Sequence, residues 1–284
     1  MGKYLKYFKT EPEYKFWKNS NEFIVPNVSV IKDNPIVNYH ISLSNTDVPN
    51  NEIHYTNSST TLPTTPYNEN VFDAVLVSNK YNESKGCWVL EFDSKITTIG
   101  PEAFYNCADL ESINLPSSIE SIGEHAFENC INLSGITLPS SLSNIADYMF
   151  YNCFKLNGTL IIPTGITSIG KYAFDNCSGL TGTLIIPNSV TTIGDHAFCD
   201  CYGLTSITIG SNVESIGDFT FSYCSGVTNI TCYAETVPSI TTNTFQGVKT
   251  NGVLKYLSKL DYSVWLNTDS YYLGYYNWTG SEIK

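Results

Sequence analysis

Cysteine and histidine are the side chains best suited to hold a metal ion, form disulfides or act as nucleophiles, and this chain has nine cysteines and four histidines. Six cysteines return at steps of 23 or 24 residues: Cys107, Cys130, Cys153, Cys177, Cys201 and Cys224. Side chains stacked coil upon coil, about 4.8 Å apart, lie along a line, whereas metal ligands must converge on one point. We therefore interpret the six as a structural ladder of buried thiols and expect no metal site. The remaining Cys87, Cys199 and Cys232 leave the redox compartment open.

Two of the histidines occupy one repeated position, directly before an Ala-Phe pair. His125 and His196 are three repeats apart, which is about 14 Å at strand spacing and too far to share a metal ion or a proton. The equivalent positions in the other copies are Glu102, Tyr148, Tyr172 and Phe219. A position that accepts such different side chains predicts partly exposed stacking rather than chemistry.

Carboxylates and known catalytic motifs give no better candidate. The acidic residues are dispersed, and the sequence has no G-x-S-x-G, H-E-x-x-H, phosphate-loop or calcium-loop motif. An asparagine precedes the ladder cysteine in four copies, at Asn106, Asn129, Asn152 and Asn176. We expect these amides to satisfy backbone groups of a turn. The sequence therefore predicts a protein without catalytic residues, metal or cofactor, and not an enzyme.

The elements that position these side chains form a tandem repeat. The pattern I-x-x-I-G-x-x-A-F-x-x-C-x-x-L returns six times, starting at Ile96, Ile119, Leu142, Ile166, Val190 and Val213. One copy cannot bury its apolar side chains alone but stacked copies can, which is typical of a solenoid. An alternating apolar pair follows and predicts a short strand, at Ile113 and Leu115, Ile136 and Leu138, Leu160 and Ile162, Leu184 and Ile186, and Ile207 and Ile209. Equivalent strands should form a parallel ladder.

The repeats resemble the BspA-like class of the leucine-rich repeat superfamily. Its signature is L-x-x-I-x-L-P followed by x-x-L-x-x-I-G-x-x-A-F-x-x-C, and residues 110–127 follow it. The resemblance implies a mainly β, curved solenoid with a short parallel strand in each of about seven coils. It also implies a role in adhesion or protein recognition rather than catalysis.

Four regions follow from where the repeat begins and ends. They are an N-terminal β arm (1–45), a linker and N-terminal cap (46–86), the leucine-rich repeat solenoid (87–248) and an aromatic C-terminal cap (249–284). Within the second region, the Asn-, Thr- and Pro-rich residues 46–70 predict a loop, and the apolar residues 71–78 predict a strand that covers the first coil. The C-terminal cap is expected to leave the repeat and to close its open end.

The N-terminal arm contains two runs that favour strands, residues 23–33 and 36–41, around Asn34-Pro35. This order of segments is similar to N-terminal segments of virion proteins from bacteriophages that infect gut anaerobes. The first 30 residues also lack the apolar core of a secretory signal, which favours release by lysis. Together these features predict a virion structural protein that uses the solenoid for attachment or adhesion. The alternative is a bacterial cell-surface or secreted adhesin that binds host protein or glycan.

The outward side chains of the predicted strands are the candidate binding residues, since leucine-rich repeats often bind through that face. They are Asn114, Thr137, Ile161, Ile185, Thr208 and Thr231. Thr137, Ile161, Ile185 and Thr208 form the candidate patch, in which two exposed isoleucines are unusual. The alternative, that Thr and Ile are selected only for strand packing, stays open. The aromatic residues of the C-terminal cap are a second candidate, for stacking on sugars.

Charge and hydropathy argue against two classes of partner. The net charge is −12, which repels nucleic acid and anionic membranes over most of the surface. No apolar run is long enough to insert into a membrane. The expected partner is therefore a protein, either of a virion assembly or a cell-surface receptor, or a glycan, and the oligomeric state stays open.

Overall fold

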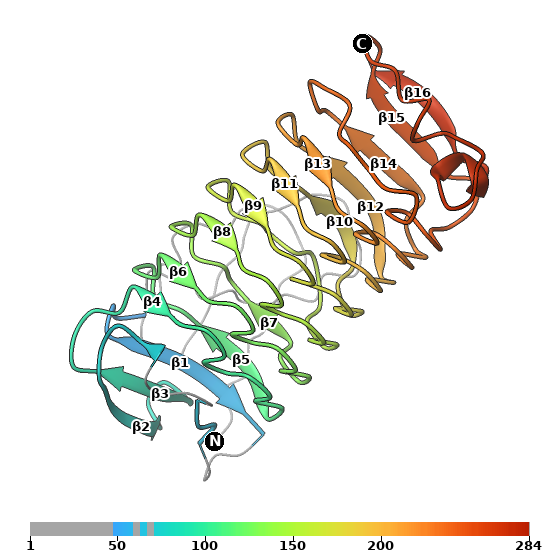
Figure 1. Ribbon diagram of the computed structural model, residues 1–284. Coiled ribbons are helices and arrows are strands. Elements are labelled where there is room, and N and C mark those ends of the chain that lie inside the picture. The colour runs from blue at the N-terminus through green and yellow to red at the C-terminus, as the bar shows by residue number, and fades with distance from the viewer. Residues whose placement is uncertain (1–47, 59–62, 67–70, 284) are drawn as a thin grey trace, which may run out of the picture. The chain divides into compact units, whose positions relative to one another are not determined.

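The computed structural model describes residues 48–58, 63–66 and 71–283. The chain divides into two compact units, Met1–Ile41 and Ser42–Lys284. The first unit, which contains the two predicted strands of the N-terminal arm, lies outside the described residues. The second unit is built of successive coils, most of them with two short strand segments joined by turns (Figure 1).

One series of strands comes from the I-x-x-I-G part of the copies. Its members are β4 (Thr98–Ile99), β6 (Ser121–Ile122), β8 (Asn144–Ile145), β9 (Ser168–Ile169), β11 (Thr192–Ile193) and β13 (Ser215–Ile216). They form two parallel sheets, one of β4 and β6 and one of β8, β9, β11 and β13. In the second sheet Ile145, Ile169 and Ile193 are partners in neighbouring coils. Strands of two residues are too short for an alternating pattern to reveal them.

A second series lies on the other side of the coils. Its members are β5 (Leu110–Asn114), β7 (Gly135–Ile136), β10 (Gly182–Ile185), β12 (Leu204–Ile209), β14 (Asn229–Cys232), β15 (Val253–Leu257) and β16 (Thr279–Ile283). The predicted parallel ladder forms where Leu184, Ile207 and Ile230 pair across β10, β12 and β14. The described residues contain no α-helix, only the 3-10 helix η3 (Leu273–Tyr276). The predicted mainly β solenoid is confirmed.

The second series is interrupted in the third copy. The predicted strand at Leu160 and Ile162 does not form, and the copy contributes only an isolated bridge between Gly158 and Leu180. The third and fourth copies are one residue longer than the others, and the added length follows Gly158 and Gly182, with φ of +80° and +77°. The register of β10 against β12 shifts directly after Gly182. An extra residue beside a glycine of positive φ is accommodated as a bulge, which shifts the register of β10 but does not prevent it from pairing.

The core is organised around a column of phenylalanine rings. The stacked rings belong to Phe104, Phe127, Phe150, Phe174, Phe198, Phe221 and Phe245. Neighbouring centroids are 5.2 to 5.8 Å apart, and each of these side chains is at most 1% exposed. The step from one coil to the next sets this spacing, so every copy buries its ring against its equivalents.

The N-terminal cap contains a strand where a loop was expected. β1 (Glu52–Asn57) lies antiparallel between β3 (Cys87–Phe92) and β5, so the expectation of a loop over residues 46–70 is wrong for β1. Ile53 and Tyr55 alternate with polar residues and are fully buried, which explains the strand. The strand expected at residues 71–78 begins later, as β2 (Leu76–Asn82).

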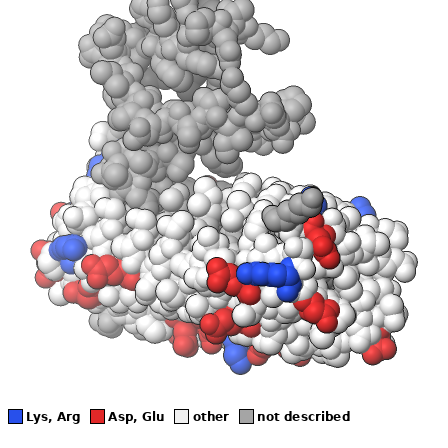
Figure 2. Space-filling model, turned by 90° about the horizontal axis from the view of Figure 1, so that it is seen from above, with Lys and Arg blue, Asp and Glu red and all other residues white. Residues whose placement is uncertain are grey.

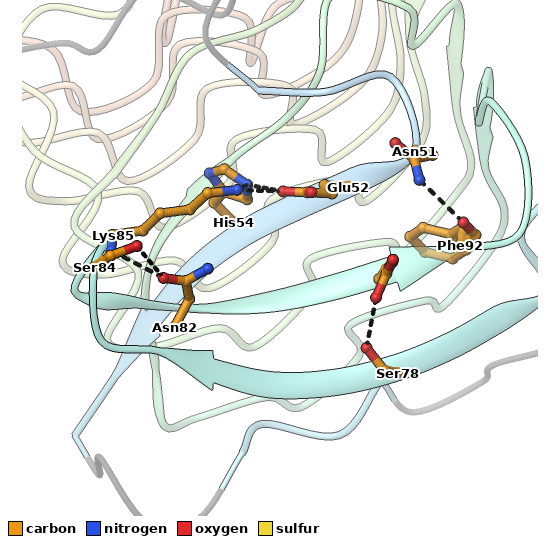
Figure 3. A network of polar contacts seen from close by, with 9 residues as sticks. Asn51, Glu52, His54, Ser78, Asn82, Ser84, Lys85 and Phe92 are labelled. Carbon is orange, nitrogen blue, oxygen red and sulfur yellow. Dashed lines mark hydrogen bonds and ion pairs between the residues drawn. The ribbon is translucent and has the colours of Figure 1, made fainter.

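Polar contacts hold the three cap strands together (Figure 3). Glu52 accepts from Lys85 Nζ at 2.6 Å and lies 2.5 Å from His54 Nε2. The turn between β2 and β3 is closed by Asn82 Oδ1, which accepts from the backbone N–H of Lys85 at 3.1 Å. Through Lys85, the carboxylate of Glu52 on β1 is thereby linked to the turn between β2 and β3.

The C-terminal cap extends the parallel sheet and covers the end of the core. β15 and β16 continue the ladder beyond β14, although residues 249–284 were expected to leave the repeat. Trp265 is fully buried, packs on the last ring of the phenylalanine column, Phe245, at 5.3 Å, and donates from Nε1 to the carbonyl of Pro238 at 3.1 Å. The apolar end of the column is therefore closed by an indole ring.

Candidate functional site

The outward strand position places the candidate patch on successive coils. Ile185 and Thr208 are cross-strand partners in β10 and β12, and Thr231 of β14 continues the row. Thr137 and Ile161 come from the two preceding copies and lie outside the named strands. The side chains of Ile161 and Ile185 are 79% and 55% exposed, whereas Thr208 is half-buried and Thr137 is exposed. The two isoleucines contribute little buried area to the fold.

The nearest neighbours of this patch on β10 and β12 are uncharged. On the same face of β10 and β12, Thr183 and Ser206 share a hydrogen bond of 2.6 Å, which fixes their hydroxyl groups. In the view of Figure 2, charged side chains form small groups of both signs on a largely uncharged surface. Exposed aliphatic side chains among neutral hydroxyls bind through apolar contact and hydrogen bonds rather than through charge.

The six ladder cysteines are free thiols in the core. From Cys130 onward, each thiol donates to the carbonyl oxygen of the core phenylalanine one coil earlier, as Cys177 does to Phe150 at 3.2 Å. Burial raises the pKa of these thiols, so they remain protonated and unreactive. The ladder is therefore a set of weak hydrogen-bond donors as well as apolar filler.

The repeated histidine position forms a second column of rings, at the surface. It consists of His125, Tyr148, Tyr172, His196 and Phe219, with centroids 4.4 to 4.8 Å apart and planes within 17°. All five are half-buried and adopt positive φ, between 53° and 58°. The partly exposed stacking predicted for this position is confirmed.

The asparagine position forms a ladder of a different kind from the expected one. The side-chain amide of Asn152 donates to Asn129 Oδ1 at 2.8 Å, and that of Asn176 donates to Asn152 Oδ1 at 3.0 Å. Asn129 bonds to Asn106 in the same way. The amides thus bond to one another rather than to the turn backbone, because equivalent asparagines of neighbouring copies lie one above the other with the same φ of 58° to 61°.

One cluster of potential metal ligands lies among the described residues. A carboxylate oxygen of Asp175, a ring nitrogen of His196 and the sulfur of Cys199 all lie within 4.8 Å of one another. His196 Nδ1 is 3.8 Å from Asp175 Oδ2, and Cys199 Sγ is 3.5 Å from Asp200 Oδ2. The other stacked histidine differs, because His125 Nδ1 contacts the carboxylate of Glu128 in its own copy.

Burial sets the protonation of this cluster. Burial, and secondarily the charge of Asp200, raise the pKa of Asp175 to about 7. Burial lowers the pKa of His196 against the opposing effect of Asp218, Asp195 and Asp200, and burial raises the pKa of Cys199. All three shifts favour the uncharged forms.

The sequence reasoning missed this cluster because it paired the histidines with each other and considered only the ladder cysteines. Asp175 and Cys199 occupy the same position of consecutive copies, two residues before the ladder cysteine. Stacking therefore places them side by side, and His196 precedes Cys199 by three residues. Equal repeat positions in neighbouring copies are the signal that would have revealed the cluster.

The aromatic residues of the C-terminal cap differ in exposure: three are buried, three are half-buried and two are exposed. Tyr262 and Trp265 are at most 1% exposed and Trp278 is 5% exposed, which leaves their faces unavailable to a sugar. Tyr271 and Tyr275 are exposed and meet edge to face with centroids 6.0 Å apart. This pair is the most exposed aromatic surface of the cap.

A family model described as BspA type leucine-rich repeat region matches residues 77–181 and 145–261, in six copies. The two matches together cover well over half of the 284 residues. The chain belongs to the BspA-type leucine-rich repeat family. The family's characteristic Ile, Phe and Cys positions are the ones that form the buried columns of the solenoid.

Solved structures similar to this BspA-type chain include leucine-rich repeat proteins from several organisms. A leucine-rich repeat protein of Bacteroides ovatus is 30% identical over 57% of this chain, with a TM-score of 0.46. A leucine-rich cell surface protein of Faecalibacterium prausnitzii is 36% identical over 51%, also with a TM-score of 0.46. The chain spans 38% of the length of each. A leucine-rich repeat protein of T. pallidum is 33% identical over 51% of this chain and 67% of its own length, with a TM-score of 0.48.

A search of curated proteins finds no match to this BspA-type chain. No helix among the described residues is long and apolar enough to span a membrane. Leucine-rich repeat proteins are typically binding or structural proteins rather than enzymes, and they generally act through contacts with other proteins.

Proposed function

We propose that this protein is a non-catalytic recognition protein that binds a protein partner through the outward strand face of its solenoid. The contact is centred on Ile161 and Ile185 and flanked by Thr137 and Thr208. Family membership supports recognition as the general role, and the exposed isoleucines supply the location.

The observation that carries this proposal is the exposure of two large aliphatic side chains at equivalent positions of neighbouring copies. Ile161 is 79% and Ile185 is 55% exposed, although both stand between buried residues. Strand propensity alone would explain a β-branched residue at this position. Threonine is β-branched too, and it occupies the same position as Thr208 and Thr231 while exposing less apolar surface than isoleucine. An exposed apolar pair on a neutral face marks a contact with another protein.

The test measures binding of the fluorescently labelled full chain to intact cells of gut anaerobes. The double variant I161S/I185S is expected to reduce binding at least about tenfold, because buried apolar anchors dominate interface energy. V75S/V77S is the matched control, since Val75 and Val77 are 66% and 61% exposed on the cap. Equal binding by I161S/I185S and wild type would contradict the proposed face. Treating the cells with protease or periodate distinguishes a protein receptor from a glycan.

We also propose that the solenoid acts as part of a bacteriophage virion, with attachment to a cell surface as its task. The support is the resemblance that we find between the N-terminal arm (1–45), with its aromatic lead and two strand-favouring runs, and N-terminal segments of virion proteins. Mass spectrometry of purified particles should find the chain in amounts comparable to other virion components. Its absence from particles, together with its presence on intact bacterial cells, would favour the alternative, a bacterial cell-surface adhesin.

A further inference from the structure

Asp175 carries a buried carboxyl group without a hydrogen-bond partner. Its side chain is 10% exposed, and the nearest polar atom recorded for it, His196 Nδ1, is 3.8 Å away. Within the described part of the chain, no group donates a hydrogen bond to this carboxyl. A buried carboxyl without a partner is costly, and such a group calls for an additional ligand.

The groups facing Asp175 are those that bind transition metals. A ring nitrogen of His196, the sulfur of Cys199 and a carboxylate oxygen of Asp175 all lie within 4.8 Å of one another. Imidazole, thiolate and carboxylate are the donors of zinc sites, whose bond lengths give donor separations of about 3.3 to 3.6 Å. The 3.8 Å between His196 Nδ1 and Asp175 Oδ2 is already within about 0.5 Å of that spacing.

The histidine is held in position by its neighbours in the surface column. The ring of His196 lies between Tyr172, at 4.4 Å and 8°, and Phe219, at 4.8 Å and 17°. Stacking on both sides fixes the plane of the ring, with Nδ1 on the side of Asp175. A fixed imidazole loses little freedom when it binds an ion.

The asparagine-ladder position also changes beside this cluster. Asp200 takes the place of the ladder asparagine and lies beside Cys199, while its Oδ1 accepts from Tyr202 Oη at 2.6 Å. The amide ladder, continuous from Asn106 to Asn176, has no amide to continue it here. Asp200 is thus a second carboxylate beside the cluster, and its negative charge favours a cation.

We propose that Asp175, His196 and Cys199 form a binding site for one divalent transition-metal ion of the zinc class. The ion bonds to one carboxylate oxygen, to the imidazole nitrogen and to the sulfur, and water fills the fourth position. The Cys199 S–H bond breaks as the sulfur–metal bond forms, and its proton passes to solvent together with any proton on Asp175. His196, with a side chain 26% exposed, provides the side from which the ion enters.

The experiment titrates the full chain, stripped with a chelator, first with Co²⁺ and then with competing Zn²⁺. The expected result is one ion per chain and a thiolate-to-cobalt charge-transfer band in the near ultraviolet, which Zn²⁺ abolishes. The variants C199S and H196Y should weaken Zn²⁺ binding at least about 100-fold, and C199S should lose the band. Zn²⁺ should raise the melting temperature of the wild type but not of C199S.

Both variants introduce residues that the fold already accepts, since Ser222 and Tyr172 occupy the same positions in adjacent copies. Circular dichroism of the metal-free proteins checks that each variant folds. H125Y and C87S are the matched controls, because they remove a stacked histidine and a free thiol outside the cluster. Absence of binding, cobalt binding without the charge-transfer band, or equal loss in H125Y and H196Y would overturn the site.

Discussion

Glu52 shows how a single side chain stabilises the N-terminal cap. Burial alone would raise its pKa, but the hydrogen bonds and charges of Lys85 and His54 outweigh burial and lower the pKa below its ordinary value of 4.5. Lys85 belongs to the turn before β3, and His54 lies on β1 beside Glu52 (Figure 3). The ionised carboxylate therefore ties two segments of the cap together.

Acid should weaken this cap in a defined pH range. Below pH 4.5 the unfolded chain binds a proton on Glu52 before the folded chain does, so stability is present above 4.5 and is lost as pH falls through the lowered pKa. Urea unfolding as a function of pH should show that the free energy of unfolding falls less steeply with decreasing pH for E52Q than for the wild type. E120Q, which removes the same charge from an exposed coil residue, separates this effect from net charge. Parallel curves for wild type and E52Q would contradict the prediction.

The turns of the coil depend on residues that accept positive φ. Each copy from the first to the sixth has two such positions. One is the position of the surface column of rings, which is Glu102 in the first copy, and the other is the position of the asparagine ladder, which is Asp200 and Tyr223 in the last two copies. A side chain in this conformation costs about 1 to 2 kcal/mol relative to glycine, and asparagine tolerates it best after glycine. Stacking and amide hydrogen bonds across coils offset that cost.

Asn152 separates the two contributions. N152A loses the hydrogen bonds to Asn129 and Asn176 and places a less tolerant residue at φ 61°, so we expect a loss of about 2 to 3 kcal/mol. N152G loses the same bonds but relaxes the backbone, so it should be about 1 kcal/mol more stable than N152A. Denaturant unfolding of both variants measures the difference. Equal stabilities would show that backbone strain has no part in the turn.

Sequence patterns predicted the coil well and its ends less well. The positions of Phe174 and Cys177 follow from the repeat, because stacking leaves them no other environment. β1 was missed, since its alternation of Ile53 and Tyr55 is short and lies among Asn- and Thr-rich residues outside the period. The strand expected at Leu160 and Ile162 does not form, whereas the fourth copy forms β10 with the same added residue, so neither the apolar pattern nor the copy length decides this pairing.

Stability of the whole solenoid depends on contacts between neighbouring coils and on the caps. Each coil touches only the coils beside it, so damage at one end spreads only through successive interfaces. Trp265 is the residue that covers the last ring of the phenylalanine column. Its loss would expose both an apolar surface and the end of a stack.

W265A tests this distribution of stability. The substitution removes a fully buried indole and should lower the free energy of unfolding by about 3 to 5 kcal/mol. The loss should fall on the C-terminal coils. Hydrogen exchange should show lost protection in β14, β15 and β16 and retained protection in β4 and β6. V264A, at a neighbouring residue that is 55% exposed, should change stability by less than about 0.5 kcal/mol. A uniform loss of protection over all coils would contradict independent interfaces.

The candidate sites differ in how far the sequence could reveal them. The outward residues Ile161 and Ile185 follow from alternation within one copy, so their exposure could be anticipated. The cluster of Asp175, His196 and Cys199 combines residues of two neighbouring copies. A motif search within one copy therefore cannot find it. Comparing equivalent positions of adjacent copies is the reading that a repeat protein requires.

The like-on-like stacking of the coils has a consequence for how such a chain can change over generations. Every interior junction presents nearly the same surfaces, so gain or loss of one complete copy leaves the chemistry at both caps intact. Each such event alters the reach of the protein by one strand spacing, about 4.8 Å. Length can therefore be tuned by tandem duplication, while the side chains facing outward diversify separately.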